Sequence, residues 1–539
     1  MNLQNSNGRS ASQPPAENLI FERADWTSFR TVEGLQQKVR CPGGQAAPSG
    51  SDSRHRHRRD GGRVMSVVDE NGDPSDRAPA SRQGPRLDRI VFATSRLIEF
   101  CSVKELTAQT GATPDQWPLV VEKELVDNAI DEAEKSGVAP VIDIVVANGE
   151  IIISDNGPGI AADTVEKILD FTVRASDKEA YVSPTRGAQG NALKTILAMA
   201  FALDGTSGTT VIEAQGVKHT ITFAVDPVRR SPKVSRSQGT SIVRNGTRIT
   251  VRWPVCASSQ LEWAKSRFLQ IAEDFTFLNP HFTLRVFWNG QLALSVKAAE
   301  PGWRKWSPSD PIPAHWYDAG RFERLIAANI AHGQDTGRDM LVREFVGTFR
   351  GLSGTTKQKA LLDEIGAARM SLAAFFAEGR NRKGVARLLA AMQEMSKSVK
   401  PGDLGIIGQD HFARRFADAQ AEMETFNYTR NLGTNDGLPW VVEVAFAWVP
   451  NATRRRLVTG VNFSPGIVNP FRSLGTIGQS LDAILAEQRA NRDDQVIVLV
   501  HLTSPVLSFT DRGKSALALG SDNSDEVWDD DEEEDEDEV

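Results

Sequence analysis

The chain has 539 residues, of which 40% are hydrophobic and 24% are charged, which is typical of soluble globular proteins with two or three domains. No apolar run reaches the roughly 18 residues that a membrane-spanning helix needs, and the polar first 40 residues lack the apolar core of a secretory signal. The three cysteines lie too far apart in sequence for a disulfide framework or a zinc site, and they fit a reducing cytoplasm. Composition therefore argues against a membrane protein and against an exported one.

The formal net charge of −8 arises at one end of the chain. Residues 521–539 carry 13 acidic residues and no Lys or Arg, and without them the net charge is +5. We expect residues 520–539 to be a disordered acidic tail. Residues 1–88 are rich in Ser, Pro, Gly and Arg and hold too few aliphatic side chains to offset their ordering entropy, so we expect them to be disordered as well.

Hydrophobic periodicity between residues 89 and 255 predicts helices mixed with hairpins. The apolar residues of 119–134 form a broad helical stripe, and Asn148-Gly149 is typical of a tight turn between two strands. This mixture indicates an α+β layered sandwich over 89–255. We expect helices at 89–100, 119–134, 162–171 and 191–202, and strands at 141–146, 150–154, 209–213, 219–224 and 247–253.

The remaining sequence divides into a helical part and a second mixed part. Residues 256–435 are expected to be a linker and a mostly helical region. Residues 436–519 are expected to be a second, α/β domain, with strands at 441–449, 457–463 and 496–502 and a helix at 477–489.

The first candidate motif is Glu124-Leu-Val-Asp-Asn128 on the helix 119–134. Positions i and i+4 share a helix face, so Glu124 and Asn128 project together. A carboxylate can polarise a water molecule, and an amide oxygen can hold Mg²⁺. The alternative is an amphipathic helix whose acidic face is merely solvated.

The second candidate motif is the strand 151–154 followed by Asp155-Asn-Gly157-Pro-Gly159. The strand delivers a carboxylate to a tight turn, and glycines let the backbone approach a planar ligand closely. A carboxylate in this position can accept a hydrogen bond from an exocyclic amine such as that of adenine. An ordinary Asp-Asn-Gly turn is the alternative.

The third candidate motif is a glycine-rich loop that runs into the helix 191–202. Its Arg186-Gly187-Ala-Gln189-Gly190 sequence continues with Asn191 and Lys194. Backbone N–H groups of such a loop and the positive end of a helix can bind phosphates. By itself, a glycine-rich loop is also compatible with a plain connection.

The order and spacing of the three motifs, followed by a strand that opens with Gly246-Thr247, resemble the Bergerat-fold (GHKL) ATPases, which include gyrase, Hsp90, MutL and histidine kinases. The segments KELVDNAIDEAEKSGVAP, DNGPGI and RGAQG are similar to those of the topoisomerase VI B-subunit family. Weaker similarity extends to residues 341–366 and 402–412, and VIVLVHLTSPVLSFTDRGKSALAL (496–519) resembles the last strand of that family's transducer domain with its lysine loop.

The resemblance implies a Bergerat ATPase sandwich, a helix-two-turns-helix insert and a transducer domain of ribosomal S5-like type. It implies that Glu124 is the general base, that Asn128 ligates Mg²⁺, and that Lys514 reaches from the transducer to the γ-phosphate of ATP. It assigns the remaining nucleotide-site residues as Asp155, Gly157, Gly159 and Thr247 near adenine and Arg186, Gly187, Gln189, Gly190, Asn191 and Lys194 near the phosphates.

The function implied by the resemblance is that of a Mg²⁺-dependent ATPase subunit in the cytoplasm, associated with the nucleoid. ATP would drive formation of a homodimeric clamp on duplex DNA, and a separate A-type subunit would cut the DNA, because this chain has only three tyrosines and no recognisable cleavage domain. Two alternatives are a stand-alone MutL- or MORC-like ATPase switch without strand passage and a structural B-like subunit that does not hydrolyse ATP. The family's third lid glycine is Ala192 here, which mildly favours the last alternative.

The sequence does not locate a DNA contact. Candidates are the basic run 54–59, Arg454-Arg455-Arg456, Lys397 and Lys400, although the triple arginine is equally compatible with capping a hairpin. The acidic tail is compatible with mimicking DNA or with aiding solubility.

Overall fold

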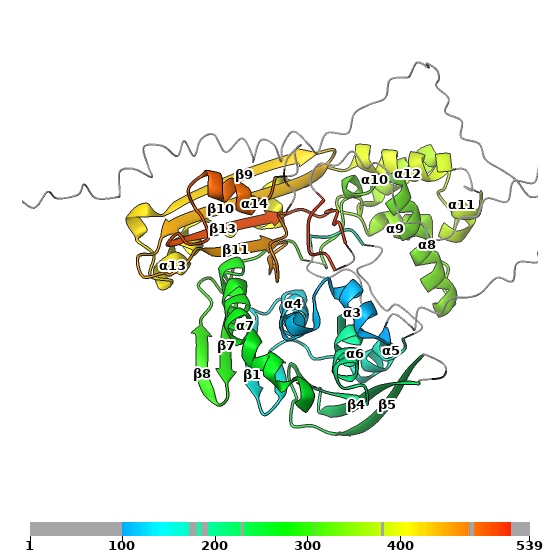
Figure 1. The fold of residues 1–539 in the computed structure, drawn as a ribbon. Coiled ribbons are helices and arrows are strands. Elements are labelled where there is room, and N and C mark those ends of the chain that lie inside the picture. Colours follow the sequence, from blue (N-terminus) through cyan, green and yellow to red (C-terminus); the bar gives the residue numbers. More distant parts are fainter. Residues whose placement is uncertain are drawn as a thin grey trace, which may run out of the picture. The chain divides into compact units, whose positions relative to one another are not determined.

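The computed structural model describes residues 100–171, 181–184, 192–226, 228, 231–307, 309–378, 382–472, 474, 479–511 and 513–518, which form two sheets and a group of helices (Figure 1). Both predicted tails, most of the predicted helix 89–100 and the predicted loop 186–191 lie outside the described residues. Of the helices that are described, none is both long and apolar enough to cross a bilayer.

The larger sheet has eight strands in the order β5-β4-β3-β6-β2-β1-β7-β8. Neighbouring strands are antiparallel except β1 and β7, which pair in parallel. The strands are β1 (Val141–Ala147), β2 (Glu150–Asp155), β3 (Gly208–Ala214), β4 (Val217–Asp226), β5 (Ser231–Thr240), β6 (Thr247–Arg252), β7 (Thr283–Trp288) and β8 (Gln291–Val296).

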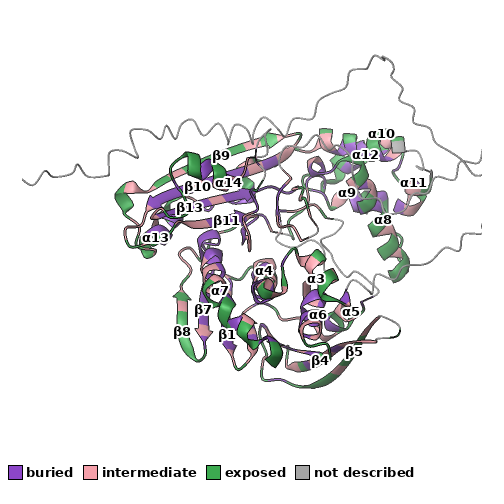
Figure 2. Ribbon diagram, viewed as in Figure 1, coloured by how far each residue is buried: buried purple, intermediate pink, exposed green. Residues whose placement is uncertain are grey.

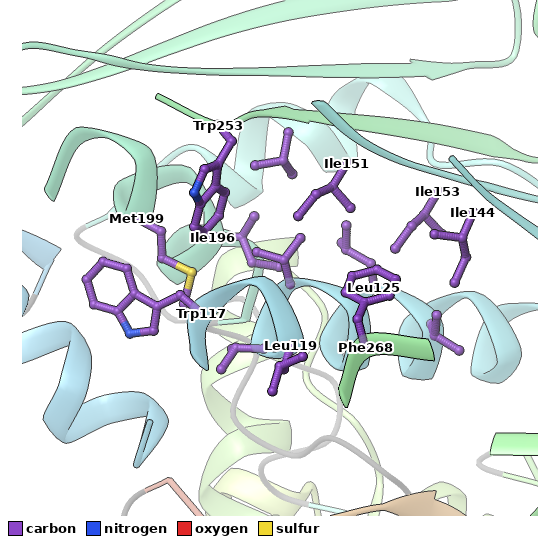
Figure 3. Close-up of a cluster of buried hydrophobic side chains, with 14 of the residues drawn as sticks. Trp117, Leu119, Leu125, Ile144, Ile151, Ile153, Ile196, Met199, Trp253 and Phe268 are labelled. Carbon is purple, nitrogen blue, oxygen red and sulfur yellow. The ribbon is translucent and has the colours of Figure 1, made fainter. Parts of the chain in front are cut away.

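Helices cover one face of this sheet and bury the main hydrophobic core. Figure 3 shows Ile144, Ile151 and Ile153 of the strands directed toward Leu125 and Ile196 of the helices. Burying each such side chain stabilises the fold by about 1.5–3 kcal/mol. The helices of this region are α3 (Val103–Thr110), α4 (Trp117–Lys135), α5 (Ala162–Ile168), α6 (Ala192–Asp204) and α7 (Ser258–Leu278).

Helix α4 is the best buried of these elements. It begins at Trp117, whose indole N–H donates to the Ala112 carbonyl oxygen over 3.1 Å, with Pro118 in the first turn, where a missing N–H costs nothing. It ends at Lys135, two residues before Gly137, whose φ of 73° lies in the left-handed region. Both ends agree closely with the predicted helix 119–134.

A group of helices follows the larger sheet and has a core of its own. Phe322, Phe345 and Phe349 pack with ring centroids 5.3–6.0 Å apart, and the residues around them are buried as well. The helices are α8 (Ala319–Thr336), α9 (Val342–Gly347), α10 (Thr355–Ile365), α11 (Leu372–Glu378) and α12 (Arg382–Met395).

The smaller sheet has five strands in the order β12-β11-β13-β10-β9, with β11 and β13 parallel. On β13, Val498 belongs to the apolar cluster of α14, whereas Ile497 and Leu499 belong to the cluster of α7 and α13. Both faces are therefore covered. The elements are α13 (Gln409–Asp418), β9 (Asn427–Asn435), β10 (Leu438–Trp448), β11 (Arg456–Val461), β12 (Ser464–Pro465), α14 (Leu481–Glu487) and β13 (Val496–Thr503).

The burial pattern explains which strands were predictable. Figure 2 shows the central strands β10 and β13 as mostly buried, while β8 and β9 are largely exposed. The predicted α+β class is confirmed, and strands β1–β4, β6, β10, β11 and β13 lie where periodicity indicated. Strands β5, β7, β8, β9 and β12 were missed; four of them are at sheet edges, where no apolar alternation is required. Because β7 pairs with β1, the larger sheet continues past residue 255. The limits that we predicted for the domains remain predictions.

Helix α13 provides a pH-dependent contact to the end of α7. The buried His411 ring donates from Nε2 to the carbonyl oxygens of Thr276 and Phe277 over 3.0 and 3.1 Å. Burial lowers the pKa of His411 to about 4, with Arg415 adding to the effect. Protonation therefore favours the unfolded chain between the ordinary histidine pKa of 6.5 and about 4.

We predict that wild-type protein loses about 2–3 kcal/mol of unfolding free energy relative to His411→Gln as the pH falls from 7 to 4, since Gln cannot be protonated. Urea unfolding across this pH range checks the difference. His332→Gln, at an exposed position of α8, is the control and should follow wild type throughout. A constant difference between wild type and His411→Gln would contradict the prediction.

Candidate nucleotide site

The polar face of α4 carries the first predicted motif. Glu124 is half-buried and Asn128 is exposed, one helical turn further on, while Leu125, Val126 and Ala129 between and beside them are buried. The apolar stripe fixes the helix on the sheet, so the Glu124–Asn128 face is turned away from the core. The two side chains thus lie on one surface of the helix, and their predicted roles remain predictions.

The second motif lies at the end of β2 and meets Gly246-Thr247 at the start of β6. Asp155 Oδ1 accepts hydrogen bonds from the backbone N–H of Gly157 over 2.8 Å and of Thr247 over 3.1 Å. Its Oδ2 accepts none from the described residues. Burial raises the pKa of Asp155 above the usual aspartate range, whereas the two N–H groups act in the opposite direction. One oxygen is therefore oriented by backbone donors, and the other is open to a ligand.

Glycines allow this meeting of backbones. Gly246 has φ 74°, and its N–H donates to the Gly157 carbonyl oxygen over 3.0 Å. A Cβ atom at Gly246 would lie 1.9 Å from the carbonyl oxygen of Asp155, and one at Gly159 would lie 2.9 Å from that of Gly246. We expected Gly157 and Gly159 to let the backbone approach a ligand, and this remains a prediction. The structure shows that Gly159 and Gly246 let two segments pack backbone to backbone, where Thr247 and Asp155 are 92 positions apart.

Asn156 is a structural residue that sequence reasoning passed over. Its Oδ1 accepts from the N–H of Val141 over 2.8 Å, and its Nδ2 donates to the Ala139 carbonyl oxygen over 3.0 Å. The side chain therefore replaces a strand partner at the start of β1. The Asp-Asn-Gly motif therefore combines the candidate ligand residue Asp155 with a residue that fixes the sheet.

The third motif is only partly described. Arg186, Gly187, Gln189, Gly190 and Asn191 lie outside the described residues, and α6 begins at Ala192. Lys194 is 1% exposed; its Nζ donates to the Asp170 carbonyl oxygen over 2.6 Å and lies 5.8 Å from the Phe171 ring centroid. These contacts direct Lys194 toward the end of the α5 segment. Its predicted role at the phosphates remains a prediction.

Lys514 lies in a loop that touches the larger domain. The residue is half-buried with φ 53°, and its Nζ is 6.0 Å from the Phe509 ring centroid. Its neighbour Gly513 packs on Gly111, the cap of α3: a Cβ atom at Gly513 would lie 2.3 Å from the Gly111 nitrogen. The structure thus brings the loop to the end of α3, while a Lys514 contact with nucleotide remains a prediction.

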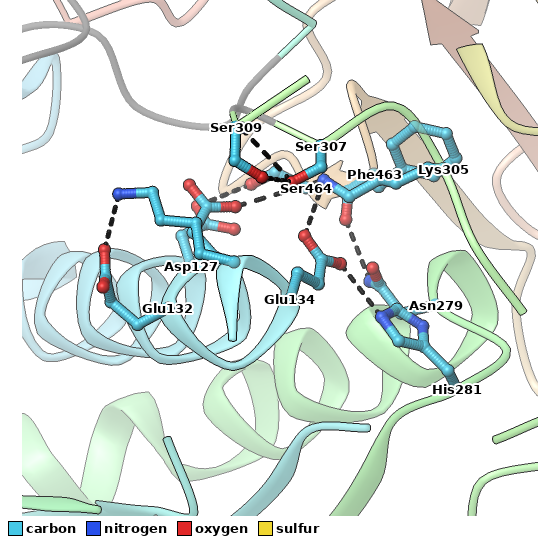
Figure 4. Close-up of polar contacts among 12 residues, drawn as sticks. Asp127, Glu132, Glu134, Asn279, His281, Lys305, Ser307, Ser309, Phe463 and Ser464 are labelled. Atoms are coloured by element: carbon cyan, nitrogen blue, oxygen red, sulfur yellow. Dashed lines mark hydrogen bonds and ion pairs between the residues drawn. The ribbon is translucent and has the colours of Figure 1, made fainter. Parts of the chain in front are cut away.

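Polar side chains also hold α4 from the side opposite the sheet (Figure 4). Lys305 is 2% exposed on its side chain, and its Nζ lies 3.1 Å from Glu134 Oε2. The Oε1 atom of Glu134 lies 2.9 Å from His281 Nε2. Ser464 Oγ of β12 donates to Asp127 Oδ2 over 2.7 Å. Sequence reasoning missed these residues because their partners are 147 or more positions away and no local pattern signals them.

The triple arginine joins elements within the chain. Arg455 pairs with Asp482 of α14, and Arg456 lies 2.8 Å from Glu273 and 2.7 Å from Asp274 of α7. Arg454 is the exposed member of the three. Two of the three guanidinium groups are therefore engaged in intramolecular ion pairs, as expected of a structural role.

Residues 119–256, which contain every motif described above except the Lys514 loop, match the family model "Histidine kinase-, DNA gyrase B-, and HSP90-like ATPase". This match identifies residues 119–256 as a GHKL ATPase domain, and such a domain implies nucleotide binding.

Over a stretch longer than that domain, the chain is similar to the B subunit of the type 2 DNA topoisomerase 6 of Archaeoglobus fulgidus. The two are 21% identical over 427 residues, which cover 76% of this chain and 67% of that protein. The resemblance predicted from sequence is thereby confirmed.

Two solved structures are also similar. The MutL ATPase domain of Aquifex aeolicus complexed with ADP is 10% identical, with 70% of this chain and 89% of that chain covered and a TM-score of 0.28. The ATPase region of Saccharomyces cerevisiae topoisomerase II is 11% identical, with 74% and 76% covered and a TM-score of 0.33.

We predict that Gly246→Ala destabilises the protein by more than about 3 kcal/mol, because the new methyl group meets the Asp155 carbonyl oxygen and because positive φ is costly for Ala. Gly149→Ala is the control: it has φ 73°, but its Cβ atom would be 3.5 Å from the Trp253 carbonyl oxygen, an ordinary contact. It should lose only about 1–2 kcal/mol. Urea unfolding measures both, and equal losses would refute the steric explanation.

Proposed function

We propose that this protein binds ATP with Mg²⁺ and hydrolyses it at the face formed by α4 and the β2–β6 turn. The observation that carries the proposal is the Asp155 carboxylate, oriented by the N–H groups of Gly157 and Thr247 within a GHKL ATPase domain. Asp155 Oδ2 accepts a hydrogen bond from the exocyclic amine of adenine. This recognition needs an acceptor that is held in a fixed position.

The hydrolytic residues are Glu124 and Asn128. Glu124 is half-buried, and there it orients and deprotonates the attacking water as general base. Asn128 is exposed, and its amide oxygen would hold Mg²⁺. Proteins usually supply only one or two ligands to Mg²⁺, and the phosphates of the substrate supply others. When bound, Mg²⁺ neutralises phosphate charge. The described residues hold no cluster of three or more His, Cys, Asp or Glu that could bind a metal ion.

The phosphates are held by the glycine-rich loop and by the smaller domain. Arg186, Gly187, Gln189, Gly190, Asn191 and Lys194 cradle them through backbone N–H groups and positive charge. Lys514 contacts the γ-phosphate and loses this partner after hydrolysis, which couples the nucleotide state to the smaller, transducer domain. Contact of the Lys514 loop with the α3 cap supports this role.

Similarity to a topoisomerase subunit supports a role as an ATP-driven clamp on DNA. ATP binding closes two copies of the chain into a clamp on duplex DNA, and a separate A-type subunit cleaves the DNA. The protein acts in the cytoplasm on the nucleoid.

We predict that purified protein hydrolyses ATP only with Mg²⁺ and that Glu124→Ala lowers kcat at least about 100-fold while retaining nucleotide binding, since removing a general base costs about 10²–10⁴ in rate. Phosphate release and ADP titration measure the two quantities. The control is Glu150→Ala, at the far end of β2, where the carboxylate pairs with Arg252. Wild-type protein that neither binds nor hydrolyses ATP would refute the proposed function and would favour a structural B-like subunit.

We predict that Lys514→Gln binds ADP like wild type but forms fewer dimers with a non-hydrolysable ATP analogue, since only the triphosphate presents the γ-phosphate to Lys514. Light scattering with each nucleotide checks the dimers. Lys397→Gln, on the segment after α12, is the control. Equal dimerisation of Lys514→Gln and wild type would exclude the γ-phosphate contact.

A further inference from the structure

A buried hydrogen bond joins the smaller sheet to the middle of α4. Ser464 Oγ donates to Asp127 Oδ2 over 2.7 Å, and Lys123 Nζ lies 2.8 Å from the same oxygen (Figure 4). Asp127 is 3% exposed and Ser464 is 7% exposed. A hydrogen bond to an ionised carboxylate shielded from water is among the stronger and more directional contacts in proteins.

Because of the position of Asp127 on the helix, this contact can affect Glu124 and Asn128. Asp127 follows Glu124 by three residues and immediately precedes Asn128, so all three belong to one helical turn. The backbone of one turn moves as a unit. A displacement of Asp127 by its partner therefore displaces both hydrolytic side chains, although Ser464 itself touches neither reacting group.

Ser464 is held rigidly by its own sheet. The preceding residues Asn462 and Phe463 have φ 50° and 66°, in the left-handed region that residues other than glycine seldom adopt. The Phe463 N–H donates to His501 Nε2 over 3.1 Å, and Asn462 Oδ1 accepts from the Ser504 N–H over 3.0 Å. This turn is therefore fastened to the end of β13, and Ser464 follows that strand.

Strand β13 leads directly into the loop that carries Lys514. That loop meets the larger domain separately, at the contact of Gly513 with Gly111. The end of β13 thus reaches the ATPase domain at two places, once through the lysine loop and once through the turn that ends at Ser464. A movement of β13 that is transmitted through Ser464 does not need Lys514.

We propose that Ser464 is a positioning residue for hydrolysis: its hydrogen bond to Asp127 sets the placement of Glu124 and Asn128 according to the position of β13. The proposal rests on the proposed ATPase function, which it deepens by adding a second route of coupling between the transducer and the hydrolytic helix. It also gives a role to the hydrogen bonds that fasten the turn at Asn462 and Phe463 to the end of β13.

Kinetics provide the first test. Ser464→Ala should lower kcat at least about tenfold and leave KM for ATP within about twofold, as expected when a charge-assisted contact that positions reacting groups is lost. In an Asp127→Ala background, Ser464→Ala should have no further effect. Ser504→Ala is the matched control, because Ser504 is also 7% exposed but donates within the loop, to the Val506 carbonyl oxygen. Its kcat should remain within about twofold of wild type.

Hydrogen exchange provides a test that needs no nucleotide. Amides of 117–135 should exchange at least about threefold faster in Ser464→Ala than in Ser504→Ala, whereas amides of α12 should be unchanged. Wild-type protein without ATPase activity would defeat the proposed function, yet faster exchange in α4 would still establish the coupling contact. Equal exchange in both variants would overturn the contact. Faster exchange with an unchanged kcat would overturn the positioning role.

Discussion

The structure depends on the burial of one helix. Helix α4 packs its apolar stripe on the larger sheet, and Asp127 and Glu134 on its other side are held by Ser464, Lys305 and His281. Only a narrow strip that contains Glu124 and Asn128 remains accessible. A helix gripped in this way cannot rotate to relieve strain, because each rotation would expose apolar surface or leave a buried charge without its partner. The two residues that we propose for hydrolysis are thus carried on a rigid element.

A rigid support also holds Asp155, in the other half of the candidate site. The Asp155 carboxylate is fixed by two backbone N–H groups, from Gly157 and Thr247, rather than by mobile side chains. Those donors can converge only because Gly246 and Gly159 lack a Cβ atom at the points where the two turns touch. The glycines therefore act on the nucleotide site indirectly. They permit a backbone contact between β2 and β6, and that contact orients the carboxylate.

Local patterns predicted much of this fold, and their failures have a common cause. The spacing of apolar residues in 119–134 and the alternation in 141–154 reflect contacts that each segment makes with one core. Strand β5 has no such pattern, because an edge strand is held by its neighbour's backbone and faces water. Strand β7, which follows helix α7, extends the sheet beyond residue 255, since its parallel pairing with β1 joins segments far apart in the chain.

The sequence by itself determined the class of fold, the order of the motifs, and the face of α4 that bears Glu124 and Asn128, since each follows from spacing within a single element. Tertiary structure alone decided which backbone groups orient Asp155, that Lys194 is buried against Asp170, and that Ser464 and the Lys514 loop contact the ATPase domain. These contacts join residues that are between 24 and about 400 positions apart. The physical reason is that a short-range period records only whether a side chain is buried, whereas its partner is chosen by the packing of the whole chain.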